Sequence, residues 1–127
     1  MSVRGGPLTA TGRCLCGAVR FEVDGPLRDV VVCHCGECRR WAGHVWATSA
    51  APRDEVRIVE DGALKWIDSP ESVTHARRGF CAECGSSLFW EAPGRDTISF
   101  SAGALDLPTG LKTTREIYTE FAGDYYE

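Results

Sequence analysis

Three tight groups of cysteines constrain this chain more than any other feature of its sequence. The 127 residues contain seven cysteines, at positions 14 and 16, at 33, 35 and 38, and at 81 and 84. Because the number is odd and the N-terminal segment "MSVRGGPLTATGR" lacks the hydrophobic block of a signal peptide, a disulfide framework explains them poorly. We expect a reducing, cytoplasmic setting, where cysteines at such spacings more often bind metal or carry out redox chemistry.

Composition narrows the possible partners. A hydrophobic share of 43% and a charged share of 25% are typical of a globular protein, and the length predicts one domain over residues 1–127. The formal net charge of −4 and the scattered basic residues argue against a nucleic acid as the main partner. No apolar stretch approaches the roughly 18 residues of a membrane span, so we expect no membrane partner either.

Alternating apolar and polar residues predict many short strands and little helix. The one expected helix is short and lies near residues 36–43, between Gly36 and Gly43. Short strands at close intervals favour an all-β sandwich or open barrel. The strands are expected at residues 19–23, 29–34, 44–50, 55–60, 63–68, 72–80, 86–91, 97–103 and 115–121.

The first predicted metal site combines "RCLCG" (13–17) with "FCAECG" (80–85). Each segment is a tight turn that presents two sulfurs, and a glycine follows the second cysteine. Four thiolates complete a tetrahedral zinc shell, so Cys14, Cys16, Cys81 and Cys84 would form a closed, structural site. Buried free cysteines and a redox-active Cys81–Cys84 pair are the alternatives, although a redox pair leaves Cys14 and Cys16 unexplained.

The second predicted site lies in "CHCGEC" (33–38). Strand alternation lets Cys33 and Cys35 point the same way, and a turn at Gly36 brings Cys38 to join them. Three protein ligands with one exchangeable position are the pattern of a catalytic zinc. Two alternatives stay open: a fourth ligand from a histidine or a carboxylate elsewhere, or a three-cysteine site that is partly empty of metal.

The candidates for that fourth ligand include three histidines. Strand alternation turns His34 away from the metal, which favours a structural role for it. His44 follows Gly43 at the start of a strand and could contact a substrate or lie on the surface. One sequence gives no basis for placing His75.

Residues around the second site suggest a substrate pocket. Trp41 and Trp46 flank the three cysteines and could form its wall, and Arg39 or Arg40 could meet a carboxylate at its rim. We therefore predict substrate contacts, beyond the metal, for Arg39, Trp41 and His44. Core packing remains the alternative for every tryptophan, and it is the favoured role for Trp66 and Trp90.

The ligand set also indicates a reaction class. Three thiolates donate strongly, so a zinc ion bound by them is a weaker Lewis acid than one bound by imidazoles. Such a soft centre suits the exchange of a fourth sulfur ligand better than the generation of hydroxide. We therefore expect binding and deprotonation of a substrate thiol, followed by its addition to a small aldehyde, or the reverse.

The motifs as a whole resemble those of the glutathione-dependent formaldehyde-activating (GFA) family, which includes the centromere-protein-V-like proteins. They are "GRCLCGAVRFEV", "CHCGECRRWAGH", "RGFCAECGSSLFW" and "SAGALD", in this order, over about residues 12–127. The resemblance implies a β-tent fold of zinc-stapled antiparallel sheets and two Zn²⁺ sites. It implies a structural zinc on Cys14, Cys16, Cys81 and Cys84 and a catalytic zinc on Cys33, Cys35 and Cys38.

The resemblance also implies an activity. Family members condense glutathione with formaldehyde to S-(hydroxymethyl)glutathione and are classed as carbon–sulfur lyases. The alternative is a non-catalytic, zinc-stapled β-tent binding module with two closed metal sites. The sequence does not indicate the oligomeric state.

Overall fold

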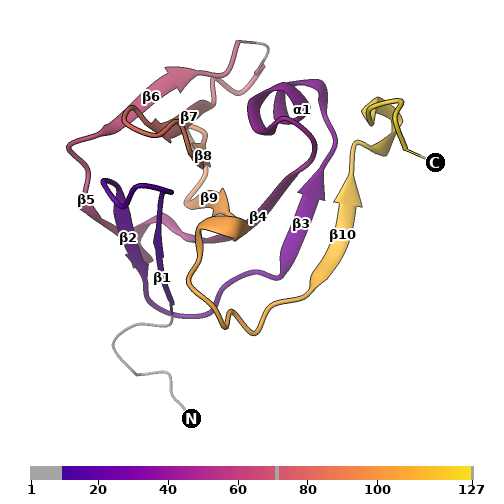
Figure 1. Cartoon of the computed structure of the whole chain (residues 1–127). Helices are drawn as coiled ribbons and strands as arrows, with labels where there is room; N and C mark the ends of the chain where they lie inside the picture. The colour runs from indigo at the N-terminus through magenta and orange to yellow at the C-terminus, as the bar shows by residue number, and fades with distance from the viewer. Residues whose placement is uncertain (1–9, 71, 127) are drawn as a thin grey trace.

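Ten strands and one α-helix make up the part of the chain that the computed structural model describes, residues 10–70 and 72–126 (Figure 1). The helix, α1 (Gly36–Ala42), ends at Gly43, whose φ of 87° reverses the chain. With ten strands and one short helix, the structure confirms the predicted all-β fold class. The strands are β1 (Ala10–Arg13), β2 (Arg20–Val23), β3 (Val30–Cys33), β4 (Trp46–Pro52), β5 (Val56–Glu60), β6 (Leu64–Asp68), β7 (Arg77–Cys81), β8 (Ser87–Glu91), β9 (Thr97–Ser101) and β10 (Thr113–Ile117).

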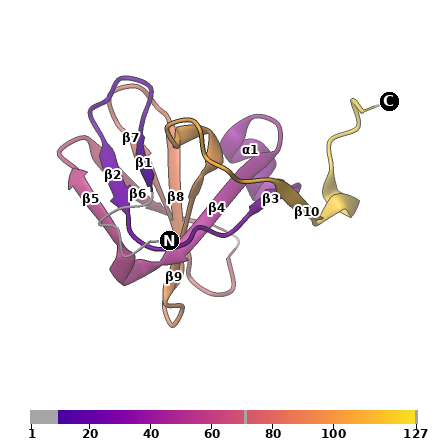
Figure 2. The same cartoon turned by 90° about the horizontal axis from the view of Figure 1, so that it is seen from below.

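The strands form two sheets, which Figures 1 and 2 show from two directions. The small sheet has the order β1-β2-β5, and the large sheet has the order β10-β3-β4-β9-β8-β7-β6. Their pairings are antiparallel, as predicted, except that β10 runs parallel to β3. A long connection after β9 carries the chain back across the molecule before β10 begins, and such a crossover is what a parallel pairing requires.

Each expected strand range overlaps a strand of the structure, with shifted boundaries. Residues 72–76 instead form a turn, because the Ser72 hydroxyl accepts hydrogen bonds from the backbone N–H groups of Thr74 and Ala76. The last strand ends at Ile117, since Tyr118 adopts a left-handed conformation with φ of 57° before a short 3₁₀-helix. The strand β1 was not predicted, because "ATGR" carries neither alternation nor β-branched apolar residues.

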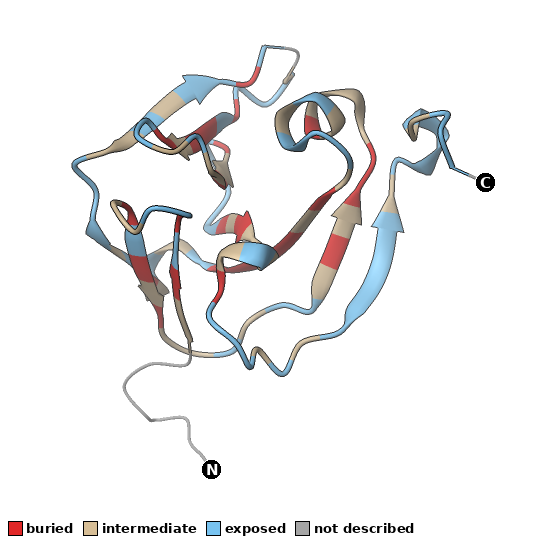
Figure 3. Cartoon of the chain, in the orientation of Figure 1, coloured by how far each residue is buried: buried red, intermediate tan, exposed pale blue. Residues whose placement is uncertain are grey.

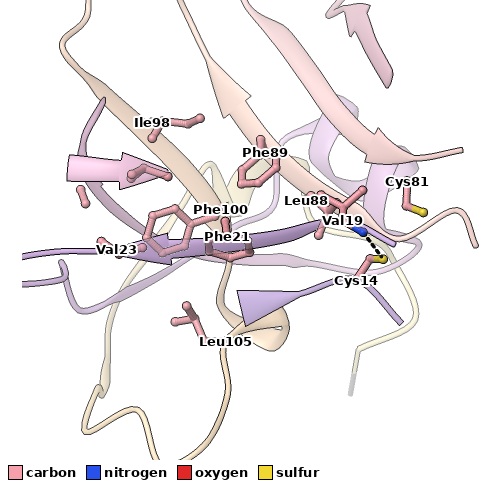
Figure 4. Packing of buried hydrophobic residues seen from close by; sticks show 12 residues of the cluster. Cys14, Val19, Phe21, Val23, Cys81, Leu88, Phe89, Ile98, Phe100 and Leu105 are labelled. Atoms are coloured by element: carbon pink, nitrogen blue, oxygen red, sulfur yellow. Dashed lines mark hydrogen bonds between the residues drawn. The ribbon is translucent and has the colours of Figure 1, made fainter. Parts of the chain in front are cut away.

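Three phenylalanines join the two sheets. Phe21 on β2 faces Phe89 on β8 and Phe100 on β9, with ring centroids 5.2 and 5.4 Å apart (Figure 4). All three side chains are buried, whereas the edge strand β10 is largely exposed (Figure 3). Opposite Phe21 on β1 stands Gly12, where a Cβ would lie 2.4 Å from the Phe21 ring, so only glycine leaves room there.

Residues 1–9 lie outside the described part of the chain, so one domain over residues 1–127 stays a prediction. Within residues 10–70 and 72–126, no helix is long and apolar enough to cross a membrane.

Replacing Phe21 with alanine should detach the small sheet from the large one. We expect Phe21→Ala to lower the free energy of unfolding by about 3–5 kcal/mol, because the ring fills the junction between the sheets. Phe121→Ala is the matched control, since this ring is 55% exposed and its loss should change stability by less than about 0.5 kcal/mol. Urea titration followed by tryptophan fluorescence measures both, and equal effects would contradict the assigned role of Phe21.

Candidate metal centres

The first group of cysteines connects the two sheets. Cys14 and Cys16 lie in the turn between β1 and β2, and Cys81 and Cys84 lie where β7 turns toward β8. Their four sulfur atoms all lie within 4.8 Å of one another. The Cys14–Cys16 and Cys16–Cys81 sulfur distances are 3.7 and 3.8 Å. Four sulfurs about 2.3 Å from one zinc ion would be separated by about 3.8 Å, so this four-cysteine group has the dimensions of a tetrahedral metal site.

The two turns hold these sulfurs by matching backbone geometry. Gly17 and Gly85 have φ angles of 84° and 81°, which let each chain reverse directly after its second cysteine. The Val19 N–H donates to the Cys14 sulfur at 3.3 Å (Figure 4), and the Cys84 N–H donates to the Cys81 sulfur at 3.5 Å. Backbone donors of this kind favour the thiolate form that binds metal.

Ser86 links the two turns directly. Its hydroxyl oxygen accepts a hydrogen bond of 2.9 Å from the Leu15 N–H and lies 3.1 Å from the Cys84 sulfur. The Ser86 hydroxyl bond is the main cause that lowers the pKa of Cys84 to about 5. A lowered pKa favours the thiolate form, in which a cysteine binds metal.

The second group of cysteines is local in sequence. Cys33 ends β3, Cys35 is the N-cap of α1, and Cys38 lies within the helix. Their sulfurs also lie within 4.8 Å of one another, and among the residues that the structure describes no further His, Cys, Asp or Glu joins them. Cys33 and Cys38 are buried and Cys35 is half-buried, so this three-cysteine group could hold a metal ion with one position left open.

Hydrogen bonds within this group stabilise negative charge. The Cys35 sulfur accepts the backbone N–H of Cys38 at 3.3 Å, the bond that caps the helix. The Cys38 side chain bonds to Cys33 and lowers the pKa of Cys33 to about 6, with help from the charge of Arg78. The same bond, together with burial, raises the pKa of Cys38 itself. The bond therefore favours negative charge on Cys33 and a proton on Cys38.

None of the three histidines completes the three-cysteine group. His34 is buried and forms a 2.8 Å bond with Glu116 on β10, which agrees with its predicted structural role. The His44 ring is stacked on Tyr126 and lies 3.2 Å from the hydroxyl of Tyr125. His75 is exposed in the turn before β7.

A cleft of about 710 Å³ lies beside the four-cysteine group. Cys14 and Leu15 line it on the side of the four-cysteine group. Trp41 and Trp46 line it on the other side, and both rings also pack against the three-cysteine group. The Trp46 indole N–H donates to Ser101 at 2.7 Å, which fixes that ring. The cleft is therefore lined by Cys14 of the four-cysteine group and by two tryptophans that pack against the three-cysteine group.

Of the three residues predicted to contact substrate, one lines the cleft and two do not. Trp41 lines the cleft, whereas Arg39 and His44 are not among its lining residues. The half-buried Arg39 lies on α1, and the exposed His44 contacts the two C-terminal tyrosines. Direct roles for Arg39, Trp41 and His44 in substrate binding stay predictions.

Sequence reasoning missed Arg78, whose guanidinium lies 3.8 Å from the Cys38 sulfur. In the sequence it is one half of an Arg–Arg pair, which usually indicates a solvated surface. The period of two along β7 could have singled it out, because one of two adjacent strand residues faces inward. The cleft serines, Ser86, Ser87 and Ser101, carried no signal that distinguished them from ordinary strand serines.

Comparison with known proteins agrees with the site. The profile of the family described as glutathione-dependent formaldehyde-activating enzyme matches residues 9–121, nearly the whole chain. The chain belongs to the GFA family. A crystal structure of a Rhodobacter sphaeroides protein is similar to this GFA chain, with a TM-score of 0.63 and 27% sequence identity. The match covers 84% of this chain and 98% of that chain. No curated protein matches this chain.

The two groups should differ in what they do for stability. Cys81→Ser removes a sulfur that links the sheets, so we expect a large loss of thermal stability together with one bound metal per chain, since metal binding is coupled to folding. Cys35→Ser is the matched control, because its group lies in one local segment, and it should lose one metal with little change in melting temperature. Elemental analysis and thermal unfolding measure both quantities. The reverse pattern would mean that the assignments of the two groups are exchanged.

Proposed function

We propose that this GFA-family protein is a zinc-dependent enzyme of the carbon–sulfur lyase type that joins glutathione and formaldehyde. The thiol R–SH adds across the C=O bond to give R–S–CH₂–OH: a carbon–sulfur bond forms, and the thiol proton ends on the former carbonyl oxygen. One observation carries the proposal. The three-cysteine group has the donors of a metal site, lacks a fourth ligand among the described residues, and lies beside a cleft.

The two groups take different parts in this proposal. Cys14, Cys16, Cys81 and Cys84 would hold a structural zinc, because their sulfur spacing suits a closed tetrahedral shell. Cys33, Cys35 and Cys38 would hold the catalytic zinc, which when bound supplies an exchangeable position that lowers the pKa of a substrate thiol. Occupancy of the second site can be partial, because three ligands bind zinc less firmly than four.

The chain's own residues would orient the thiol and exclude water. Trp41 and Trp46 give the cleft an apolar wall against the three-cysteine group, and this wall lowers the local dielectric around a reacting sulfur. The cleft also contains one cation and one anion, Arg13 and Asp106. Glutathione carries carboxylates and an ammonium group, so these two side chains can fix the ends of the tripeptide.

Thiol binding tests the proposal before any kinetic measurement. We expect two metals per chain in protein purified without chelator. After cobalt replaces zinc, glutathione should change the visible absorption spectrum of the three-cysteine site and leave that of the four-cysteine site unchanged. Cys35→Ser cobalt protein supplies the control, because it should show no response. One metal per chain, or no response to thiol in the wild type, would favour the non-catalytic binding module.

Turnover tests the reaction itself. The wild type should form S-(hydroxymethyl)glutathione faster than the uncatalysed reaction, and Cys35→Ala should fall to the background rate because the catalytic metal has lost a ligand. Lys65→Gln is the control variant, since Lys65 is exposed on β6 and should retain wild-type activity. Exchange NMR between formaldehyde hydrate and the adduct measures the rates. A wild-type rate equal to background would refute the proposed activity.

A further inference from the structure

A buried arginine contacts the three-cysteine group. Arg78 lies on β7 and is 4% exposed, which is unusual for a charged side chain. Two guanidinium nitrogens lie 3.8 and 3.9 Å from the Cys38 sulfur, a distance at which an N–H can donate to a thiolate. The charge of this arginine is therefore directed at one of the three proposed zinc ligands.

Neighbouring groups fix the guanidinium in this position. Its Nε–H donates to the Ser69 hydroxyl at 3.0 Å, and the Ser69 hydroxyl in turn donates to the Glu37 carboxylate. Glu37 lies 3.6 Å from a terminal nitrogen of Arg78. The Trp41 and Trp46 rings lie 5.7 and 5.6 Å from the guanidinium carbon. The guanidinium is thus contacted by Ser69 from the β6–β7 connection, by Glu37 from α1 and by two aromatic rings.

The adjacent arginine provides the contrast. Arg77 is exposed, lies 3.9 Å above the Trp66 ring, and pairs with Glu91 at 2.6 Å. These contacts are those of an ordinary surface cation on an antiparallel sheet. Because the two side chains are adjacent on one strand, Arg77 serves as a matched control for Arg78.

We propose that Arg78 is a positioning residue of the three-cysteine centre, which holds Cys38 in its ligand rotamer and offsets the centre's negative charge. This inference rests on the proposed function. Three thiolates with Zn²⁺ carry a net charge of −1, and an incoming substrate thiolate makes it −2. A fixed cation beside Cys38 favours both states, and the second more than the first.

The role predicts two effects that are independent of turnover. A hydrogen-bonded thiolate donates less electron density, so removal of Arg78 should lower the energy of the Cys38 sulfur-to-cobalt charge-transfer band. Loss of a partner that orients a metal ligand typically reduces metal affinity by about 10–100-fold. Thiol affinity at the site should fall as well, because the doubly negative state loses its counter-charge.

The experiment uses the full chain loaded with cobalt at both sites. Arg78→Gln should weaken cobalt binding at the three-cysteine site by about 10–100-fold in a chelator competition and shift its charge-transfer band to longer wavelength. Arg78→Lys keeps the charge and should recover part of both effects. Arg77→Gln should behave as the wild type. The unchanged spectrum of the four-cysteine site reports that each variant is folded.

Ser69→Ala keeps the test decisive if Arg78→Gln does not fold. It leaves the charge in place but removes the acceptor that orients the guanidinium, so a smaller shift in the same direction is expected. The role of Arg78 would be overturned if Arg78→Gln bound cobalt with wild-type affinity and showed an unshifted band. If only Ser69→Ala folds, the same result in that variant would overturn it. Failure of the proposed function is a different result, in which the wild-type cobalt protein itself gives no response to glutathione.

Discussion

The rest of the structure depends on the link between two turns, one from each sheet. The small sheet consists of three short strands, and its buried residues Phe21 and Val23 belong to the core that it shares with the large sheet. Phe21 attaches it from the inside, and the four-cysteine group attaches it at one end. A metal ion there would close a loop from the first turn to the second, which restricts the unfolded chain as a disulfide does. The small core and the proposed metal cross-link would therefore act together to hold the small sheet against the large one.

The two cysteine groups differ in a way that follows from their position in the chain. The four-cysteine group combines residues about seventy positions apart, so it can form only after the sheets have come together. The three-cysteine group lies within residues 33–38, at the junction of β3 and α1, and needs only local structure. With metal bound at both groups as proposed, metal loss at the first would oppose folding, whereas the second could exchange a ligand, or the metal, within a folded protein. The catalytic role proposed for the three-cysteine group requires this difference between the two groups.

Spacing and alternation predicted the division of the cysteines, the strand ranges and the short helix, because each depends on neighbouring residues. The parallel pairing of β10 with β3 depends on the path of a long connection, which no local pattern encodes. Tertiary contacts alone distinguish Arg78 from Arg77, since Ser69, Glu37 and two tryptophans bury Arg78, whereas Arg77 stays exposed and contacts Trp66 and Glu91 at the sheet surface. The cleft could not be predicted for the same reason: segments from four separate parts of the chain form its walls.

Residues from one cysteine group, and residues packed against the other, line the same cleft. Cys14 and Leu15 form part of its wall, and the Leu15 N–H is bound by Ser86 from the opposite turn. The four-cysteine group thus contributes to one wall, while Trp41 and Trp46 line the cleft and pack against the three-cysteine group. A metal that takes no part in the reaction would still shape the space in which a thiol lies. Under the proposed function, substrate orientation would depend on both cysteine groups, and the turn between β1 and β2 would form one wall of the reaction site.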